Sequence, residues 1–164
     1  MNELCEFPSN QKWELLYRAT RDGFSGEDFH RQCDSKTRTL TIIKSTNGNI
    51  FGGYTNEAWA KDNQYKLDPN TFLFSLVNKA NTPFKINVSL PQYAIYGNAS
   101  HGPAFGGGHD IYISTNSNAN SNSYSNFGHT YQLPNYQSGT THAQSIFAGS
   151  YNFQTVEIEV FVKI

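Results

Sequence analysis

The sequence predicts a mainly β protein in which two antiparallel sheets pack as a β-sandwich with a few peripheral helices. Charged residues make up only 15% of the 164 residues and aromatic residues another 15%. Abundant Asn, Ser, Thr and Gly favour strands and turns over helices. Short alternating segments recur between turn signals, and only one segment carries clear helix-start signals. Together these observations indicate the sandwich class.

The N-terminal part of the chain predicts one strand followed by the one confident helix. Apolar and polar residues alternate over residues 13–18, which indicates a short strand with one face packed inward. Ser25 can then cap a helix by accepting from the Asp28 amide, and Asp28 can reach back in a capping box. We expect this helix to end near Cys33, because turn-forming residues follow it.

A β-hairpin is the clearest local prediction after the helix. Residues 37–44 and 50–55 flank the dipeptide Asn47-Gly48, which readily accepts two positive φ angles in a hairpin turn. Further strands are predicted at residues 71–77, 84–89, 93–96, 109–115 and 155–164.

The last predicted strand separates apolar from polar residues. Val156, Ile158, Val160, Val162 and Ile164 fall on one face, whereas Thr155, Glu157, Glu159 and Lys163 fall on the other. Glu157 and Glu159 could form a catalytic carboxylate pair, but a solvated face produces the same pattern. We expect Glu157 to be solvated. For Glu159 we expect partial cover by a neighbouring loop, with an Arg or backbone amides as partners.

Nine of the twelve residues at 115–126 are Asn or Ser. Such side chains compete with backbone hydrogen bonds, so we expect an exposed, mobile loop that adds little to the core and is dispensable for folding. The chain has no internal repeat and no long linker, which predicts a single domain over residues 1–164 with a core at about 13–162.

Charge and hydropathy exclude several partner classes. The net charge of −1 offers no clustered cations for nucleic acid or anionic lipid. Apolar runs are far shorter than the roughly 20 residues that a membrane-spanning helix needs. The N-terminus has no export signal, so we expect a cytoplasmic protein in which Cys5 and Cys33 are reduced.

No residue of the sequence is assigned as a catalytic residue or as a metal ligand. The five His lack metal-binding spacing, and Ser145 has no nucleophile elbow around it. The glycines at 106–108 precede a predicted strand rather than a helix, so they do not form a phosphate loop. His109 and Asp110 stay as candidate contacts for a ligand or an ion.

Several motifs occur together in an order and spacing that resemble a TLDc domain, over about residues 13–162. They are Trp13-x-Leu15-Leu16-Tyr17, Asp22-Gly23-Phe24-Ser25, Ile50-Phe51-Gly52-Gly53-Tyr54 followed by Trp59, Phe105-Gly106-Gly107-Gly108, and Val156-Glu157-Ile158-Glu159-Val160. The family's fold, a sandwich of two antiparallel sheets with helices at its edge, agrees with the prediction made from alternation and turns.

The resemblance implies a non-enzymatic protein-interaction module without a cofactor. Known TLDc proteins include oxidation-resistance and nuclear-receptor-coactivator proteins, so the implied role is protection from oxidative stress and binding of the cytosolic sector of the vacuolar proton pump. The family's characteristic glycines and final-strand acid fall on Gly52, Gly53, Gly106, Gly107, Gly108 and Glu159. Their implied roles are architectural or interface-forming.

Two other functions stay open at this point. Loops rich in Tyr, Asn and Gly would suit a lectin-like module for a glycan or another small ligand. The other hypothesis is a weak hydrolase or an oxidant-handling enzyme. The resemblance also leaves open that these residues are the C-terminal fragment of a larger protein, and the oligomeric state is not predicted.

Overall fold

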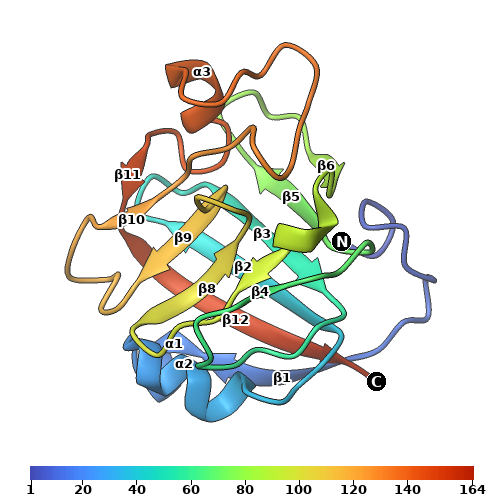
Figure 1. Ribbon diagram of the computed structural model, residues 1–164, viewed down its shortest axis with the longest axis vertical. Helices are drawn as coiled ribbons and strands as arrows, with labels where there is room; N and C mark the ends of the chain where they lie inside the picture. The colour runs from blue at the N-terminus through green and yellow to red at the C-terminus, as the bar shows by residue number, and fades with distance from the viewer.

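A computed structural model describes all 164 residues and confirms the predicted sandwich of two antiparallel sheets (Figure 1). The first sheet has the order β1 (Trp13–Arg18), β12 (Thr155–Lys163), β2 (Thr39–Ser45), β3 (Ile50–Thr55), β5 (Phe72–Val77) and β6 (Phe84–Asn87). The second has the order β11 (Asn152–Phe153), β10 (Ser123–Tyr124), β9 (Ile111–Ser114), β8 (His101–Phe105), β7 (Ile95–Tyr96) and β4 (Tyr65–Lys66).

The main core lies between the two sheets. The first sheet contributes Ile43, Phe51, Leu73, Ile86, Ile158 and Val160, and the second contributes Ile95, Phe105, Ile111, Ile113 and Phe153. All these side chains are at most 3% exposed. A smaller apolar cluster around Tyr54, Phe72 and Phe74 covers the outer face of the first sheet.

The predicted helix is α2 (Gly26–Cys33), and its capping box is confirmed. The Asp28 amide donates to Ser25 Oγ at 3.0 Å, and the Ser25 amide donates to Asp28 Oδ2 at 3.2 Å. Figure 1 shows α2 and the short α1 (Ala19–Asp22) beside β1, and α3 (Thr141–Gln144) at the opposite end of the molecule. No helix is long and apolar enough to cross a membrane.

The β2–β3 hairpin is confirmed, but its turn differs from the expected one. Only Gly48 has a positive φ, of 83°. The Gly48 amide donates to the Ser45 carbonyl at 2.9 Å, and the Ser45 amide donates to the Asn49 carbonyl at 3.0 Å. One left-handed glycine at the end of the turn is typical of a three-residue hairpin loop. Asn47 keeps a negative φ, and its side chain donates to the Ala148 carbonyl.

The second sheet was predicted less well than the first. In place of a strand over 93–96, a 3₁₀ turn η1 (Pro91–Tyr93) precedes the two-residue β7. The strand expected from residue 109 begins at Ile111, because His109 has a φ of 61°. Strands β4, β8, β10 and β11 were missed. Three of them have two residues each, and β8 contains Gly and Pro, which normally break strands.

A β-bulge changes the predicted faces of β12. The register with β2 shifts between Thr155 and Glu157. Thr155 is therefore buried and Val156 is 41% exposed, the reverse of the prediction. Ile158 and Val160 reach the core as expected. A bulge adds one residue to the strand and moves the residues before it to the other face.

The expectation of an exposed loop at residues 115–126 holds for only part of the segment, because six of its residues are exposed but three serines are buried. Ser117, Ser123 and Ser125 are fully buried, and Ser123 begins β10. The Ser117 hydroxyl lies 2.7 Å from the hydroxyl of Thr155 in the first sheet. Small hydroxyl side chains can be buried when neighbouring groups satisfy their hydrogen bonds, as they do for Ser117 and Ser123, so low hydrophobicity did not prevent packing.

Both cysteines are free and buried, in two different apolar clusters. Burial raises the pKa of the Cys5 thiol to about 11 and also raises the pKa of Cys33. Neither thiol is an accessible thiolate in this fold.

Candidate functional site

The triple glycine forms the turn between β8 and β9. Gly106 and Gly108 have φ angles of 88° and 71°, in the left-handed region that favours glycine. A Cβ on Gly106 would lie 2.0 Å from Asp110 Oδ2, whereas a Cβ on Gly108 would have no neighbouring atom within 4 Å. At Gly107, the nearest side chains would lie at 3.3 Å. Gly106 is therefore required both for its conformation and for the close approach of Asp110.

Asp110 lies beneath this turn and is fully buried. Its Oδ1 accepts from the amides of Gly128, His129 and Tyr131, and its Oδ2 accepts from the amide of Thr130, at 3.1–3.3 Å. Burial raises the pKa of this carboxyl to about 6, although the amide donors favour the charged form. The carboxyl group holds the 128–131 segment against the second sheet. The oxygens of Asp110 are used inside the fold, and its contact with a ligand or an ion stays a prediction.

His109 is not oriented by Asp110, its neighbour in sequence. Its Nδ1 lies 3.2 Å from the Gly106 carbonyl oxygen, and its ring stacks on Tyr112 with an interplanar angle of 22°. No group of three or more His, Cys, Asp and Glu side chains is arranged to hold a metal ion. His109 belongs instead to a continuous line of aromatic rings.

This line of rings crosses the outer face of the second sheet, and we refer to it as the tyrosine–histidine row. Its members are Tyr151, Tyr124, Tyr112, His109, His101, Tyr96, Tyr65, Tyr93 and His129. Contacting rings have centroids 4.7–6.3 Å apart. On β9, Ile111 and Ile113 point into the core, so Tyr112 between them points outward. The strands β10, β8, β7 and β4 each add a ring to the row.

The row consists of tyrosine and histidine rings, and its ends are open to solvent. Tyr65 and Tyr151 are each 40% exposed, and Tyr93 is 37% exposed. Burial lowers the pKa of His101 and of His109, which favours their neutral forms. None of the tyrosine hydroxyls in the row is buried without a partner. The arrangement offers aromatic surface together with free hydroxyl groups, the combination that is enriched in protein interfaces.

The other predicted residues lie on the first sheet, away from the row. A Cβ on Gly52 would lie 1.9 Å from the Thr41 carbonyl oxygen, and one on Gly53 would lie 2.7 Å from the Phe105 ring. Gly53 thus allows the two sheets to approach each other. Glu159 is half-buried and pairs with Arg18, with 2.7 Å between Nη2 and Oε1.

Glu157 is not the solvated acid that the sequence predicts. Its Oε1 accepts from the Thr20 amide at 3.1 Å, and its Oε2 accepts from the Thr20 hydroxyl. Thr20 lies in the first turn of α1, whose N-cap residue Arg18 provides no side-chain cap. Glu157 therefore caps α1 from the neighbouring strand.

The sequence points to His109 but not to the other rings of the row. The alternation of Ile111, Tyr112 and Ile113 predicts one outward tyrosine. Most of the other rings stand on two-residue strands or in turns, which have no periodic signal of their own, and His101 begins β8, whose Gly and Pro are atypical of a strand. Only the pairing of these strands brings the rings together.

Comparison with known proteins gives one family and one set of relatives. The family model of the TLDc domain matches residues 1–163. The MTOR-associated protein MEAK7 of Danio rerio is 33% identical over 64 residues, which are 39% of this chain and 14% of that protein. The Gallus gallus protein of the same name is 35% identical over 68 residues, 40% of this chain and 14% of the relative. The Xenopus laevis protein is 29% identical over 79 residues, 46% of this chain and 16% of the relative. The aligned part is thus only about a seventh of each relative.

Proposed function

Because the chain belongs to the TLDc family, we propose that it is a non-enzymatic protein-interaction module whose contact surface is the tyrosine–histidine row. The exposed tyrosine rings of the second sheet carry this proposal. Tyrosine is enriched among the residues that dominate binding energy, since it buries a large area at a small cost in side-chain entropy. Nine rings, each in contact with at least one neighbour, also provide a surface that is already ordered before binding.

The proposed partner is a subunit of the cytosolic sector of the vacuolar proton pump, with protection from oxidative stress as the cellular role. This partner places the chain in the cytoplasm. The relatives are named MTOR-associated proteins, so an MTOR-containing assembly is the second candidate partner. The resemblance to TLDc proteins supports the first candidate, and the names of the relatives support the second.

The experiment measures binding of the purified chain to the purified cytosolic pump sector by biolayer interferometry. The variants Tyr65→Ser/Tyr93→Ser and Tyr151→Ser alter the two exposed ends of the row. Val156→Ser is the matched control, because Val156 is equally exposed but lies on the first sheet. We expect roughly a tenfold or greater loss of affinity for the row variants and no change for the control.

The contact surface, the partner and the cellular role are tested separately. Equal binding of row variants and wild type would refute the assignment of the surface. If the wild type binds an MTOR-containing assembly and not the pump sector, the first partner is wrong. Circular-dichroism melts of all variants establish that lost binding is not lost folding. Peroxide survival of cells that express wild type or row variants tests the cellular role.

A further inference from the structure

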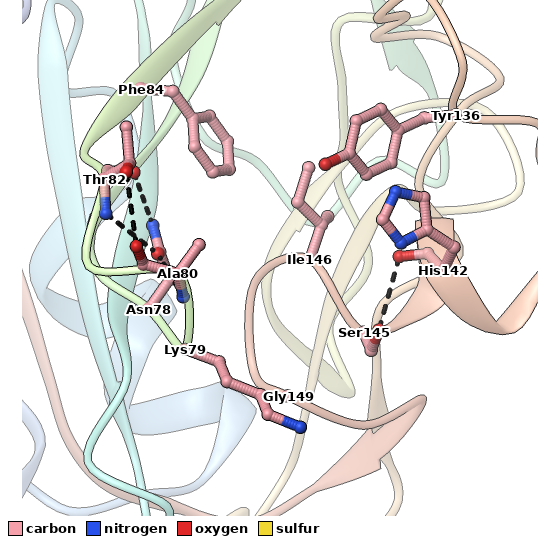
Figure 2. Close-up of a pocket in the computed structure, with 10 residues that line it drawn as sticks. All are labelled: Asn78, Lys79, Ala80, Thr82, Phe84, Tyr136, His142, Ser145, Ile146 and Gly149. Atoms are coloured by element: carbon pink, nitrogen blue, oxygen red, sulfur yellow. Dashed lines mark hydrogen bonds between the residues drawn. The ribbon is translucent and has the colours of Figure 1, made fainter.

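A pocket of about 420 Å³ lies at the end of the sandwich that carries α3. Figure 2 shows Phe84 on one wall facing Tyr136 and Ile146 on the other, with Lys79 at the mouth. The loop between β5 and β6 forms the first wall, and residues 136–149 form the second. The volume is near the lower end of small-ligand sites, about 300–1,000 Å³, and suits a ligand of one or two residues.

Both walls are held in place without a ligand. Asn78 is buried, and its side chain accepts from the amides of Ala80 and Thr82 and donates to the Thr82 carbonyl and to Ser75 Oγ. These bonds, most of them drawn in Figure 2, fix the first wall. On the second wall, the rings of Tyr136 and His142 stack at a centroid distance of 4.3 Å. The pocket is therefore preformed, which lowers the entropy cost of binding.

Among the Lys, Arg, Asp and Glu side chains of the protein, only one lysine lines the pocket. Lys79 is the only Lys or Arg that lines it, and no Asp or Glu does. Lys79 is exposed at the mouth and makes no ion pair within the chain. An anionic group placed at the mouth would gain a cation that has no competing partner.

The geometry of Ser145 and His142 favours binding rather than hydrolysis. Ser145 Oγ donates to the backbone carbonyl of His142 at 3.3 Å, as Figure 2 shows. The imidazole of His142 is stacked on Tyr136 instead. A serine nucleophile would need that imidazole as its hydrogen-bond acceptor.

We propose that this pocket binds a carboxylate that carries an adjacent aromatic side chain. The aromatic group lies between Phe84 and Ile146, and the carboxylate lies at the ammonium group of Lys79. Two sources share this chemistry: a small aromatic organic acid, and the C-terminal residue of a peptide. The site is separate from the tyrosine–histidine row, so it does not depend on the proposed function.

The test is an NMR titration of the ¹⁵N-labelled chain with N-acetylphenylalanine and with N-acetylphenylalanine amide as the uncharged probe. We expect amide shifts confined to residues 78–84 and 136–149, with a Kd on the order of 1 mM for the acid. The amide should bind about two- to fivefold more weakly, the range that a partly exposed ion pair provides.

Two variants test the role of the cation. Lys79→Gln should abolish the preference for the acid over the amide. Lys36→Gln, which removes another exposed lysine, should keep it. A peptide of four glycines ending in phenylalanine distinguishes the sources: tighter binding than the acid indicates a peptide C-terminus, and weaker binding indicates a small acid. The proposal is overturned by the absence of shifts in these segments at about 10 mM probe, or by equal binding of acid and amide to wild type.

Discussion

The buried carboxyl group of Asp110 should make the protein less stable as the pH rises from about 4 to about 6. Burial raises its pKa from the ordinary value of 3.8 to about 6. A group that binds its proton more tightly in the folded state stabilises that state below the unfolded pKa, and this contribution is lost as the pH rises through the folded pKa. The folded and unfolded pKa values of Asp110 differ by about 2, and a pKa difference of 1 is equivalent to about 1.36 kcal/mol, so the contribution to stability is ~3 kcal/mol.

Urea unfolding of wild type and Asp110→Asn at several pH values between 4 and 8 measures this contribution. The variant has no titrating group at this position. The free energy of unfolding of wild type minus that of the variant should therefore fall by about 2 kcal/mol between about pH 4 and pH 7, because part of the ~3 kcal/mol is already lost at about pH 4, close to the unfolded pKa. Glu3→Gln, which removes an exposed carboxyl group, should follow the wild type.

The sign of the result decides between two physical effects at Asp110. Four backbone amides donate to its oxygens, and such bonds alone would lower the pKa of a carboxyl group. If the difference in unfolding free energy rises with pH, these bonds outweigh the loss of hydration. A difference that is constant with pH would mean that no pKa shift occurs, and the argument would fail.

Three further predictions concern the sheets and the Ser-rich segment. Gly53→Ala should cost about 1–3 kcal/mol in thermal melts because its Cβ would overlap a ring of the other sheet. Gly108→Ala, with open space around it, should cost only about 1 kcal/mol. Glu157→Gln should destabilise the protein at least as much as Glu159→Gln. Loss of a helix cap costs about 0.5–2 kcal/mol, whereas loss of a partly exposed ion pair costs about 0–1 kcal/mol. The opposite order of the two variants in urea unfolding would contradict the capping role of Glu157. Replacing residues 115–126 by a short Gly/Ser loop should lower the melting temperature by several degrees, about 2–4 °C for each kcal/mol in a chain of this size. An unchanged melt would show that the buried serines contribute nothing.

Features that depend on neighbouring residues in the chain were already determined by the sequence. The capping box of Ser25 and Asp28 needs only three residues of separation, and its bonds are those predicted. The β2–β3 hairpin and the buried positions Ile158 and Val160 follow from turn chemistry and from alternation. These signals, with the glycine motifs, also sufficed for the fold class and the family resemblance.

Features that depend on pairing between distant segments were decided only by the tertiary structure. Two-residue strands such as β10 and β11 have no periodicity of their own and form because β9 pairs with β10. The bulge in β12 exchanged the faces of Thr155 and Val156, and alternation cannot show a bulge. Burial of Ser117 depended on a hydroxyl partner in the other sheet.

The candidate surface shows the same division. His109 and the triple glycine were visible in the sequence, but the rings of Tyr96, His101 and Tyr112 contact His109 only because the consecutive strands β7, β8 and β9 pair. The raised pKa of Asp110 arises from burial under a segment about twenty residues away. Helix caps and turns are encoded by a few neighbouring residues, whereas desolvation and ring contacts exist only once the sheets have packed. For that reason the sequence predicted the β-sandwich, and only the tertiary structure decided the candidate surface.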